Sequence, residues 1–212
     1  MRFKRKRALK RSPATRSAKR YFYLFSEGEK TEKSYFNTIG STLDSRRTKI
    51  IYKGPLGAPK TVANAAVKFA DQKGLSKTRR KKRLNSFEEK DEVWAVFDRD
   101  DFTCYGEAKQ ICDRAGISYA YSDPCFELWI NLHFDDYDAP CSRHEAQAIT
   151  KTLIGEYNPK AGKIADFSLF VDKISEAEKR AERQRANRKY EDNEDGNPST
   201  SVYMLTRSLR KD

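Results

Sequence analysis

The sequence predicts an α/β fold in which a parallel sheet is covered by helices on both faces. Two observations favour this class: several short runs are apolar throughout, and helical segments alternate with them along the chain. A strand that is apolar throughout has both of its faces buried, as the strands of a parallel sheet do. A chain of 212 residues is long enough for one such domain with an extension.

The first half of the chain is expected to contain two strands, each followed by a helix. Residues 21–25 (YFYLF) are aromatic and apolar, and a Ser-Glu-Gly turn follows them. The next apolar residues share one helical face; they are Tyr35, Phe36, Ile39 and Leu43. Residues 49–52 form a brief second strand. The clearest amphipathic helix comes next, with an apolar face made of Val62, Ala65, Ala66, Phe69 and Ala70.

Strands and helices also alternate in the second half of the chain. Residues 93–97 (VWAVF) are wholly apolar, and the helix expected at 105–114 ends before a glycine. A further strand is expected at 117–121, and an almost entirely apolar helix at 124–134 begins with a proline. Strands in this order, with helices between them, give a Rossmann-like sheet.

Beyond residue 135 the sequence is expected to be mostly helical. In the long helix predicted at 164–190, apolar residues dock the N-terminal half and the basic half projects. A loop with Gly196 and Pro198 is expected at 193–200, before a short final segment at 201–209. We therefore divide the chain into a disordered basic arm at 1–20, an α/β domain at 21–135 and a helical extension at 136–212.

The net charge of +12 is concentrated in three places. Residues 1–20 hold ten basic residues and no acid, which suits a nucleic-acid backbone or another anionic surface. The stretch 173–189 pairs bases with acids three or four residues apart, so an exposed helix explains it as well as nucleic-acid contact does. A basic loop is our candidate for nucleic-acid binding, with a solvated loop as the alternative. It contains Lys77, Arg79, Arg80, Lys81, Lys82 and Arg83.

The cysteines and histidines and the length of the apolar runs exclude a zinc-finger protein and a membrane-spanning protein. The four cysteines form no CxxC pair and the two histidines complete no zinc-finger spacing, so we expect reduced, packed thiols. No apolar run approaches the roughly 18 to 20 residues that span a bilayer. We therefore expect a cytoplasmic protein without membrane contact.

Acidic residues follow three of the four predicted strands. They are Glu27 after the first, Asp98, Asp100 and Asp101 after the third, and Asp123 after the fourth. Parallel strands end at one edge of a sheet, so these side chains are expected to converge there. Glu127 joins them, because a carboxylate on so apolar a helix needs a partner. Asp101 and Asp123 could instead be helix N-caps.

Clustered carboxylates indicate a site for a hard cation. They repel one another unless they are protonated or neutralised, and oxygen-only ligands select Mg²⁺ or Mn²⁺. Such an ion can hold a phosphate oxygen and lower the pKa of an attacking water, which is the chemistry of phosphodiester cleavage. A phosphoryl-transfer pair at Asp98 and Asp100 is disfavoured, because that motif ordinarily ends the first strand. Residues 54–60 (GPLGAPK) lack P-loop spacing, so we expect no nucleotide hydrolysis by this chain alone.

Four blocks of sequence resemble the RloB family, whose members carry a Toprim-like domain and occur in prokaryotic defence and restriction-associated loci. The blocks are FSEGEKTEKSYF at 25–36, VFDRDD at 96–101, SDPCFELWINLHF at 122–134 and NPSTSV at 197–202. Toprim domains carry a Glu after the first strand and an Asp-x-Asp after a later one. Glu27 with Gly28 matches the first motif, and Asp98 with Asp100 matches the second.

The resemblance implies a Mg²⁺- or Mn²⁺-dependent nuclease effector in anti-phage abortive infection, cleaving RNA such as tRNA, or DNA. Asp98 and Asp100 would be metal ligands, and Glu27 a general acid/base or a further ligand. Glu127 lies in the family's own PCFE block and is a further catalytic candidate. Lys30 and Lys33 could contact the scissile phosphate, although exposed helix lysines are the plainer interpretation.

The resemblance also implies partners. They are a nucleic acid, an ABC/SMC-like ATPase encoded nearby that senses infection, and a second copy of the chain as one allowed assembly. The competing hypothesis is a non-catalytic nucleic-acid-binding or sensor subunit of a defence complex, in which the acids are structural, because a Toprim-like fold can keep its shape without catalysis.

Overall fold

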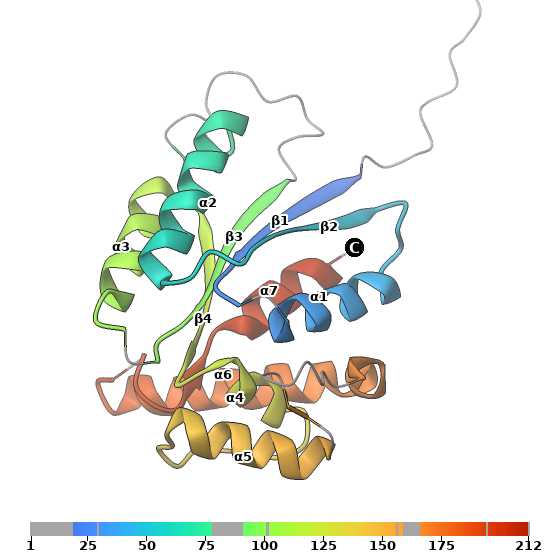
Figure 1. Ribbon diagram of the computed structural model, residues 1–212, viewed down its shortest axis with the longest axis vertical. Helices are drawn as coiled ribbons and strands as arrows, with labels where there is room; N and C mark the ends of the chain where they lie inside the picture. The colour runs from blue at the N-terminus through green and yellow to red at the C-terminus, as the bar shows by residue number, and fades with distance from the viewer. Residues whose placement is uncertain are drawn as a thin grey trace, which may run out of the picture.

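The structure, a computed structural model, describes residues 19–28, 30–77, 91–100, 102–155, 157–158, 166–193 and 195–211. The expectation of a disordered arm therefore concerns residues that lie almost entirely outside the described part of the chain. Within that part, a mostly parallel sheet is flanked by helices (Figure 1). The predicted α/β class is confirmed, and the arrangement agrees with a Rossmann-like or Toprim-like fold.

The sheet has the strand order β2-β1-β3-β4-β5. Each predicted strand is present and slightly longer than expected: β1 (Arg20–Ser26), β2 (Thr48–Lys53), β3 (Glu92–Asp98) and β4 (Ser118–Asp123). These four strands pair in parallel. The fifth, β5 (Ser199–Thr200), falls where a loop was expected and pairs antiparallel with β4. Segments 78 residues apart thus share one ladder through Ser122 and Thr200.

Helices cover both faces of the sheet. One face carries α2 (Pro59–Lys73) and α3 (Tyr105–Ala115), and the other carries α1 (Thr31–Thr42) and α7 (Val202–Arg210) (Figure 1). The predicted face of α2 is confirmed at Val62, Ala66 and Ala70, which are fully buried. α2 and α3 both end at glycines with positive φ, a backbone conformation that glycine adopts without strain.

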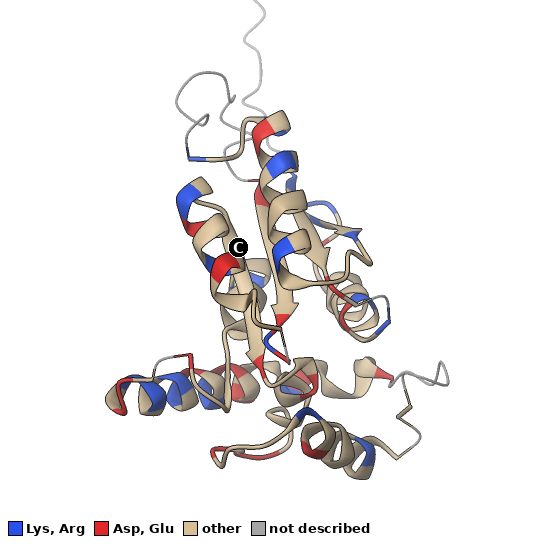
Figure 2. Ribbon diagram, turned by 60° about the vertical axis from the view of Figure 1, so that its left-hand side comes forward, with Lys and Arg blue, Asp and Glu red and all other residues tan. Residues whose placement is uncertain are grey.

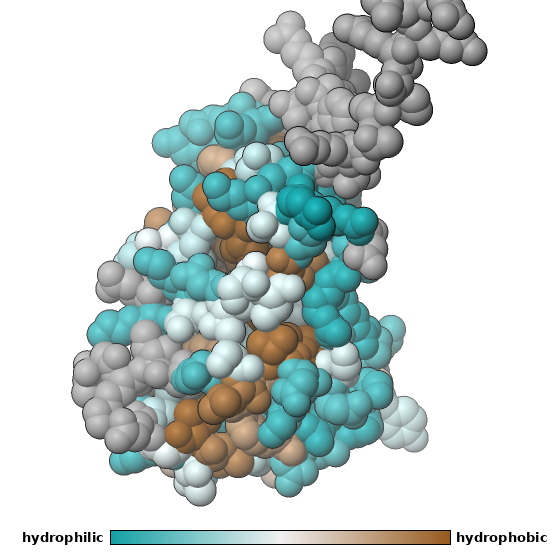
Figure 3. All heavy atoms as spheres, turned by 90° about the vertical axis from the view of Figure 1, so that its right-hand side faces the viewer, coloured by the Kyte–Doolittle hydropathy of each residue, from teal (hydrophilic) through white to brown (hydrophobic). Residues whose placement is uncertain are grey.

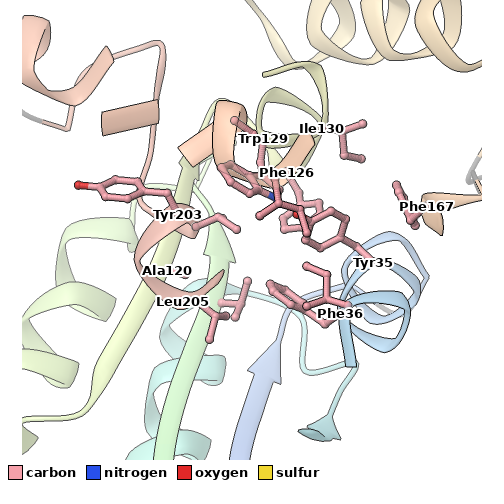
Figure 4. Packing of buried hydrophobic residues seen from close by; sticks show 14 of the residues in the cluster. Tyr35, Phe36, Ala120, Phe126, Trp129, Ile130, Phe167, Tyr203 and Leu205 are labelled. Carbon is pink, nitrogen blue, oxygen red and sulfur yellow. The ribbon is translucent and has the colours of Figure 1, made fainter. Parts of the chain in front are cut away.

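The larger hydrophobic core lies on the α1 side of the sheet (Figure 4). Tyr35 on α1 packs edge-on against Phe126 and Trp129, with ring centroids 5.5 and 6.2 Å apart. Residues from the C-terminal part, including Ile174 and Leu205, belong to the same cluster. One core therefore joins the two sides of residue 135, and the division into 21–135 and 136–212 stays a prediction.

Two helices follow the carboxyl end of β4. The predicted helix at 124–134 is confirmed only as α4 (Phe126–Asn131), all of it buried. It stops early because the next residues form i to i+3 turns, with His133 N–H bound to the Ile130 carbonyl. α5 (Arg143–Ile154) then begins with a capping box formed by Ser142 and Glu145. Figure 1 shows α4, α5 and α6 beyond the carboxyl ends of the strands.

The long helix expected at 164–190 is divided into two elements. A 3₁₀ helix, η3 (Phe167–Lys173), leads into α6 (Ile174–Tyr190). Leu169 on η3 is the most exposed of the large aliphatic side chains among the described residues. On the side of the molecule that carries β2 and α1, hydrophobic residues reach the surface along a central band flanked by hydrophilic ones (Figure 3).

The prediction that α6 projects its basic half is only partly correct, because Lys179, Arg183 and Lys189 are exposed whereas other basic residues pack against the rest of the protein. Arg188 is only 6% exposed, and its guanidinium binds Asp138 at 3.2 Å. Arg183 pairs with Asp136, and Arg180 donates to the Leu132 carbonyl at 2.8 Å. Asp136 and Asp138, in the loop before α5, thus pair with basic residues of α6. Figure 2 also shows acidic residues interleaved with basic ones along the helix itself. Arg180, Arg183 and Arg188 of α6 therefore have a structural role, because each of them binds another part of the protein.

No helix in the described part of the chain is long and apolar enough to cross a bilayer. All four cysteines lie in that part and carry free thiols, with Cys112 and Cys125 buried, as the sequence predicts.

Candidate active site

The carboxyl ends of β1 and β3 bring the first two acidic motifs together. Ser26 of β1 lies opposite Val96 of β3 in a parallel register, so the residues that follow each strand are neighbours. The backbone N–H of Asp98 donates to the Glu27 carboxylate. Acidic residues at the strand ends are visible in Figure 2. The convergence that the strand order suggests is thus present for Glu27 and Asp98.

A cavity of about 560 Å³ opens beside these strand ends. Its acidic wall contains Glu32, Asp98 and Glu127, and Lys30 lies at the start of α1 beside them. α5 also lines the cavity, with residues such as Arg143 and Lys151. Acidic and basic side chains therefore line the same space, which is of the size that takes a small ligand.

Glu27 holds its proton far more tightly than an ordinary glutamate. Burial is the main cause, and the charges of Asp100 and Glu32 add to it, so that its pKa rises from 4.5 to about 8. The hydrogen bond from Asp98 and the charge of Arg143 act in the other direction. The Oε2 atom of Glu27 is buried and makes no hydrogen bond within the described residues. A buried carboxylate oxygen without a partner is a candidate ligand for a cation.

Glu32 is a member of the site that the sequence interpretation missed. It lies in the first turn of α1 and is 8% exposed. Burial and the charge of Glu127 raise its pKa from 4.5 to about 7, against hydrogen bonds from the backbone of Gly28 and of Glu32 itself. The signal was present, because Glu32 precedes Tyr35, Phe36 and Ile39 at the spacing of the apolar face.

Gly28 makes room for the Glu32 carboxylate. A Cβ atom at Gly28 would lie 2.5 Å from Glu32 Oε2 and 2.7 Å from Oε1. The Gly28 carbonyl accepts hydrogen bonds from the Ser26 and Tyr52 hydroxyls, each at 2.9 Å. The turn after β1 is therefore held by side chains of β1 and β2, with its glycine against the carboxylate of α1.

Asp98 and Asp100 differ in their surroundings. Burial, followed by the charges of Glu32, Glu27, Glu127 and Asp100, holds the pKa of Asp98 well above its usual range. Asp100 has a positive φ of 41°, and its Oδ2 accepts from Arg143 Nη1 at 2.5 Å. Arg143, the first residue of α5, is a second site residue that the sequence interpretation missed. No local pattern marks it, since its partner lies 43 residues away.

Glu127 has the partner that its apolar helix demands. The Tyr157 hydroxyl donates to Glu127 Oε1 at 2.7 Å and lies 3.0 Å from the Thr31 hydroxyl. Because a phenol has one proton, Tyr157 must accept from Thr31 while it donates to Glu127. Asn131, the other polar residue on this face of α4, binds Ala146 and Thr150 of α5 instead.

Other candidates lie away from the cavity or outside the described residues. Asp123 is not part of the site, because its carboxylate binds Arg99 at 2.7 Å and Asn197 at 3.1 Å. Lys77 lies at the opposite edge of the sheet, where its N–H binds the carbonyl of Ala115 at the end of α3. Those outside the described residues are Asp101, Arg79, Arg80, Lys81, Lys82 and Arg83.

The residues of the site fit Mg²⁺ or Mn²⁺ in their chemistry. The available donors are carboxylate oxygens, Glu27 Oε2 lacks a hydrogen-bond partner, and the crowded negative charges raise one another's pKa. No three Asp, Glu, His or Cys side chains in the described ranges form a ready-made metal-binding group. Binding would therefore require these carboxylates to draw together around the ion.

The stability of the metal-free protein is expected to fall as the pH rises from about 5 to about 8. Glu27 and Glu32 have pKa values of about 8 and about 7 in the folded protein and ionise near 4.5 when unfolded. As the pH rises, the unfolded chain releases these two protons before the folded protein does. The contribution of the protonated carboxyls to the free energy of unfolding is therefore complete below pH 4.5 and is lost as the pH rises through the pKa values of the folded protein. Melting temperatures across this range, with and without Mg²⁺, will check it. A melting temperature independent of pH would contradict the expectation.

Comparison with known protein families gives one match. The model of the family described as RloB-like protein matches residues 22–209, which is most of the chain. No curated protein and no solved structure matches it.

Proposed function

The chain belongs to the RloB-like protein family, and we propose that it is a metal-dependent nuclease that acts as the effector of a prokaryotic anti-phage system. One observation carries the nuclease proposal: four buried or half-buried carboxylates from different parts of the chain converge, and their charges help to raise the pKa of three of them, Glu27, Glu32 and Asp98. The fourth is Glu127. Carboxylates that are crowded together in this way destabilise the folded protein at neutral pH. A function that uses their negative charge explains why the protein contains them.

The residues divide into roles by position. Asp98 and Asp100 are the proposed metal ligands at the end of β3, and Glu27 completes the set or exchanges a proton with the substrate. Glu32 and Glu127 add charge from α1 and α4. A Mg²⁺ or Mn²⁺ ion held by these oxygens would neutralise the phosphate and lower the pKa of an attacking water. The Tyr157 hydroxyl, which donates to Glu127 Oε1, would hold that carboxylate in position.

The proposed substrate is the phosphodiester backbone of RNA, such as tRNA, or of DNA. The resemblance to the RloB family supports the defence setting, in which an ABC/SMC-like ATPase detects infection and this chain acts as the toxin in abortive infection. The acidic wall alone would repel a polyanion, so substrate binding depends on the cations that also line the cavity.

The second candidate is a non-catalytic nucleic-acid-binding or sensor subunit. Two observations favour it: the described carboxylates form no ready-made metal group, and Asp100 is already paired with Arg143. In this hypothesis Arg143 takes the place of a metal ion and the acids hold α5 in position.

A cleavage assay separates the two candidates. The purified full chain is incubated with total tRNA and with plasmid DNA in Mg²⁺, Mn²⁺ or EDTA, with and without the ATPase encoded nearby. An Asp98→Asn protein, purified in parallel, controls for contaminating nucleases. The nuclease proposal expects products only with metal and only from the unaltered chain. Intact nucleic-acid binding without cleavage in any condition would support the sensor subunit.

A further inference from the structure

α5 presents one consistent face to the cavity. The residues that line it from this helix are Arg143, His144, Gln147, Ala148 and Lys151. Their spacing of one, four, five and eight residues from Arg143 places them on one side of a helix. The other side packs against α4, where Asn131 donates to the Ala146 carbonyl at 3.0 Å and accepts from Thr150 at 2.7 Å. The orientation of the helix is therefore fixed by buried hydrogen bonds.

The cavity face of α5 is basic, and the residues that β3, α1 and α4 contribute to the lining include the carboxylates Asp98, Glu32 and Glu127. Lys151 is exposed and makes no ion pair with any described residue, and half of the Arg143 side chain is exposed. These cations attract a negatively charged group such as a phosphate to α5. The next group along the same ligand can then lie near the carboxylates of the cavity. A phosphodiester strand has this character, since it can be bound by cations on one side and attacked from the other.

We propose that the cavity face of α5, through Arg143 and Lys151, binds the phosphates of an unpaired nucleic-acid strand and holds it against the carboxylates. The inference rests on the proposed nuclease function and assigns its substrate-binding surface. It differs from the basic loop at 77–83 that the sequence suggested, because Lys77 lies at the far edge of the sheet.

The dimensions of the face fit several nucleotides of one strand. Arg143 and Lys151 are eight residues apart, or ~12 Å along the helix axis. A stacked strand rises ~3.4 Å per nucleotide, so the face spans about three to four nucleotides. The cavity, at about 560 Å³, is of the size that takes one nucleotide, so the neighbouring nucleotides of the strand would lie along the exposed side of α5.

Arg143 can bind Asp100 and a phosphate together. Its guanidinium has five N–H donors in a planar fork, and the bond from Nη1 to Asp100 uses one of them. The remaining donors suit the bidentate binding of a phosphate. Arg143 would thus place the strand at a fixed position relative to the Asp98 and Asp100 motif.

The test measures binding without cleavage. Asp98→Asn is the parent, so that nucleic acid stays intact, and Arg143→Gln and Lys151→Gln are added to it singly. Labelled single-stranded RNA, single-stranded DNA and duplex DNA are titrated in EDTA at several salt concentrations. The matched controls are Arg114→Gln and Lys68→Gln, which remove exposed cations from α3 and α2 on the other face of the sheet.

Each α5 variant is expected to bind single strands about three- to tenfold more weakly than its parent, with a salt slope smaller by about 0.7 for each phosphate that is no longer bound. The controls should bind like the parent, and RNA and DNA arms will show which strand is preferred. Unchanged affinity and slope in both α5 variants, no binding by the parent, or a preference for duplex would overturn the proposal. If binding behaves as expected and the unaltered chain never cleaves, the nuclease proposal fails and the α5 surface stands.

Discussion

Replacing Glu32 with glutamine is expected to lower the rate of metal-dependent cleavage by about 10²- to 10⁴-fold, the range typical of charged groups that act in the reaction. Glutamine keeps the shape and removes the charge that Glu32 contributes between Glu127 and Asp98. The rate is measured with Mg²⁺ and Mn²⁺ on whichever nucleic acid the unaltered chain cleaves.

The same change should stabilise the metal-free protein. At pH 8 the ionised Glu32 is buried among other carboxylates, with a pKa raised to about 7, so its neutral analogue removes an unfavourable charge. In a chain of this size each kcal/mol raises the melting temperature by about 2 to 4 °C. Opposite effects on activity and stability are the signature of a functional charge. Equal losses of both would instead make Glu32 a structural residue.

Glu176→Gln is the matched control for Glu32→Gln. Glu176 lies on the exposed side of α6 and pairs with Lys179 at 2.8 Å, a surface ion pair of little energetic weight. Its replacement should change neither the rate nor the melting temperature by a measurable amount.

Replacing Gly28 with alanine is expected to lower the cleavage rate by about 10²-fold, because a displacement of about 1 Å in a catalytic group costs this much. The new Cβ would stand 2.5 Å from Glu32 Oε2, so the carboxylate has to move. The backbone of Gly28 is not in the left-handed region, and alanine adopts it without strain. The melting temperature should therefore stay close to that of the unaltered chain.

Gly106→Ala is the control for this change. Nothing lies within 4 Å of a Cβ at Gly106, which is in the first turn of α3. The variant should keep full activity and gain stability, since alanine is favoured over glycine in a helix by up to about 1 kcal/mol. If Gly28→Ala is as active as Gly106→Ala, the close approach to Glu32 has no role in the reaction.

The sequence was sufficient to predict the main sheet because its strands are apolar on both faces. This property is local, and it marked β1, β3 and β4 within a few residues of their bounds. It also placed Glu27 and Asp98 at the same edge, since parallel strands end together. β5 escaped prediction because its two residues take their strand conformation from pairing with β4.

The parts that could not be predicted depend on contacts between distant residues. Arg143 meets Asp100, Arg183 meets Asp136 and Arg99 meets Asp123 only after the chain has folded. A pattern of charges within one helix cannot identify a partner in another loop, so α6 was expected to project. Glu32 is different, because it could have been predicted from the sequence. Like Glu127, it is a carboxylate on the apolar face of a helix.

The hydrophobic core that the N- and C-terminal parts share determines when the site can form during protein synthesis. The acids of the cavity come from residues 27 to 127, yet α1 and α4 pack in a cluster that needs Ile174, Val202 and Leu209. The carbonyl of Tyr121 in β4 also binds the N–H of Ser201 at 2.8 Å. A chain still being translated cannot complete this packing until the ribosome has passed Leu209. The packing around the cavity is therefore complete only after the C-terminal residues of the cluster have been synthesised.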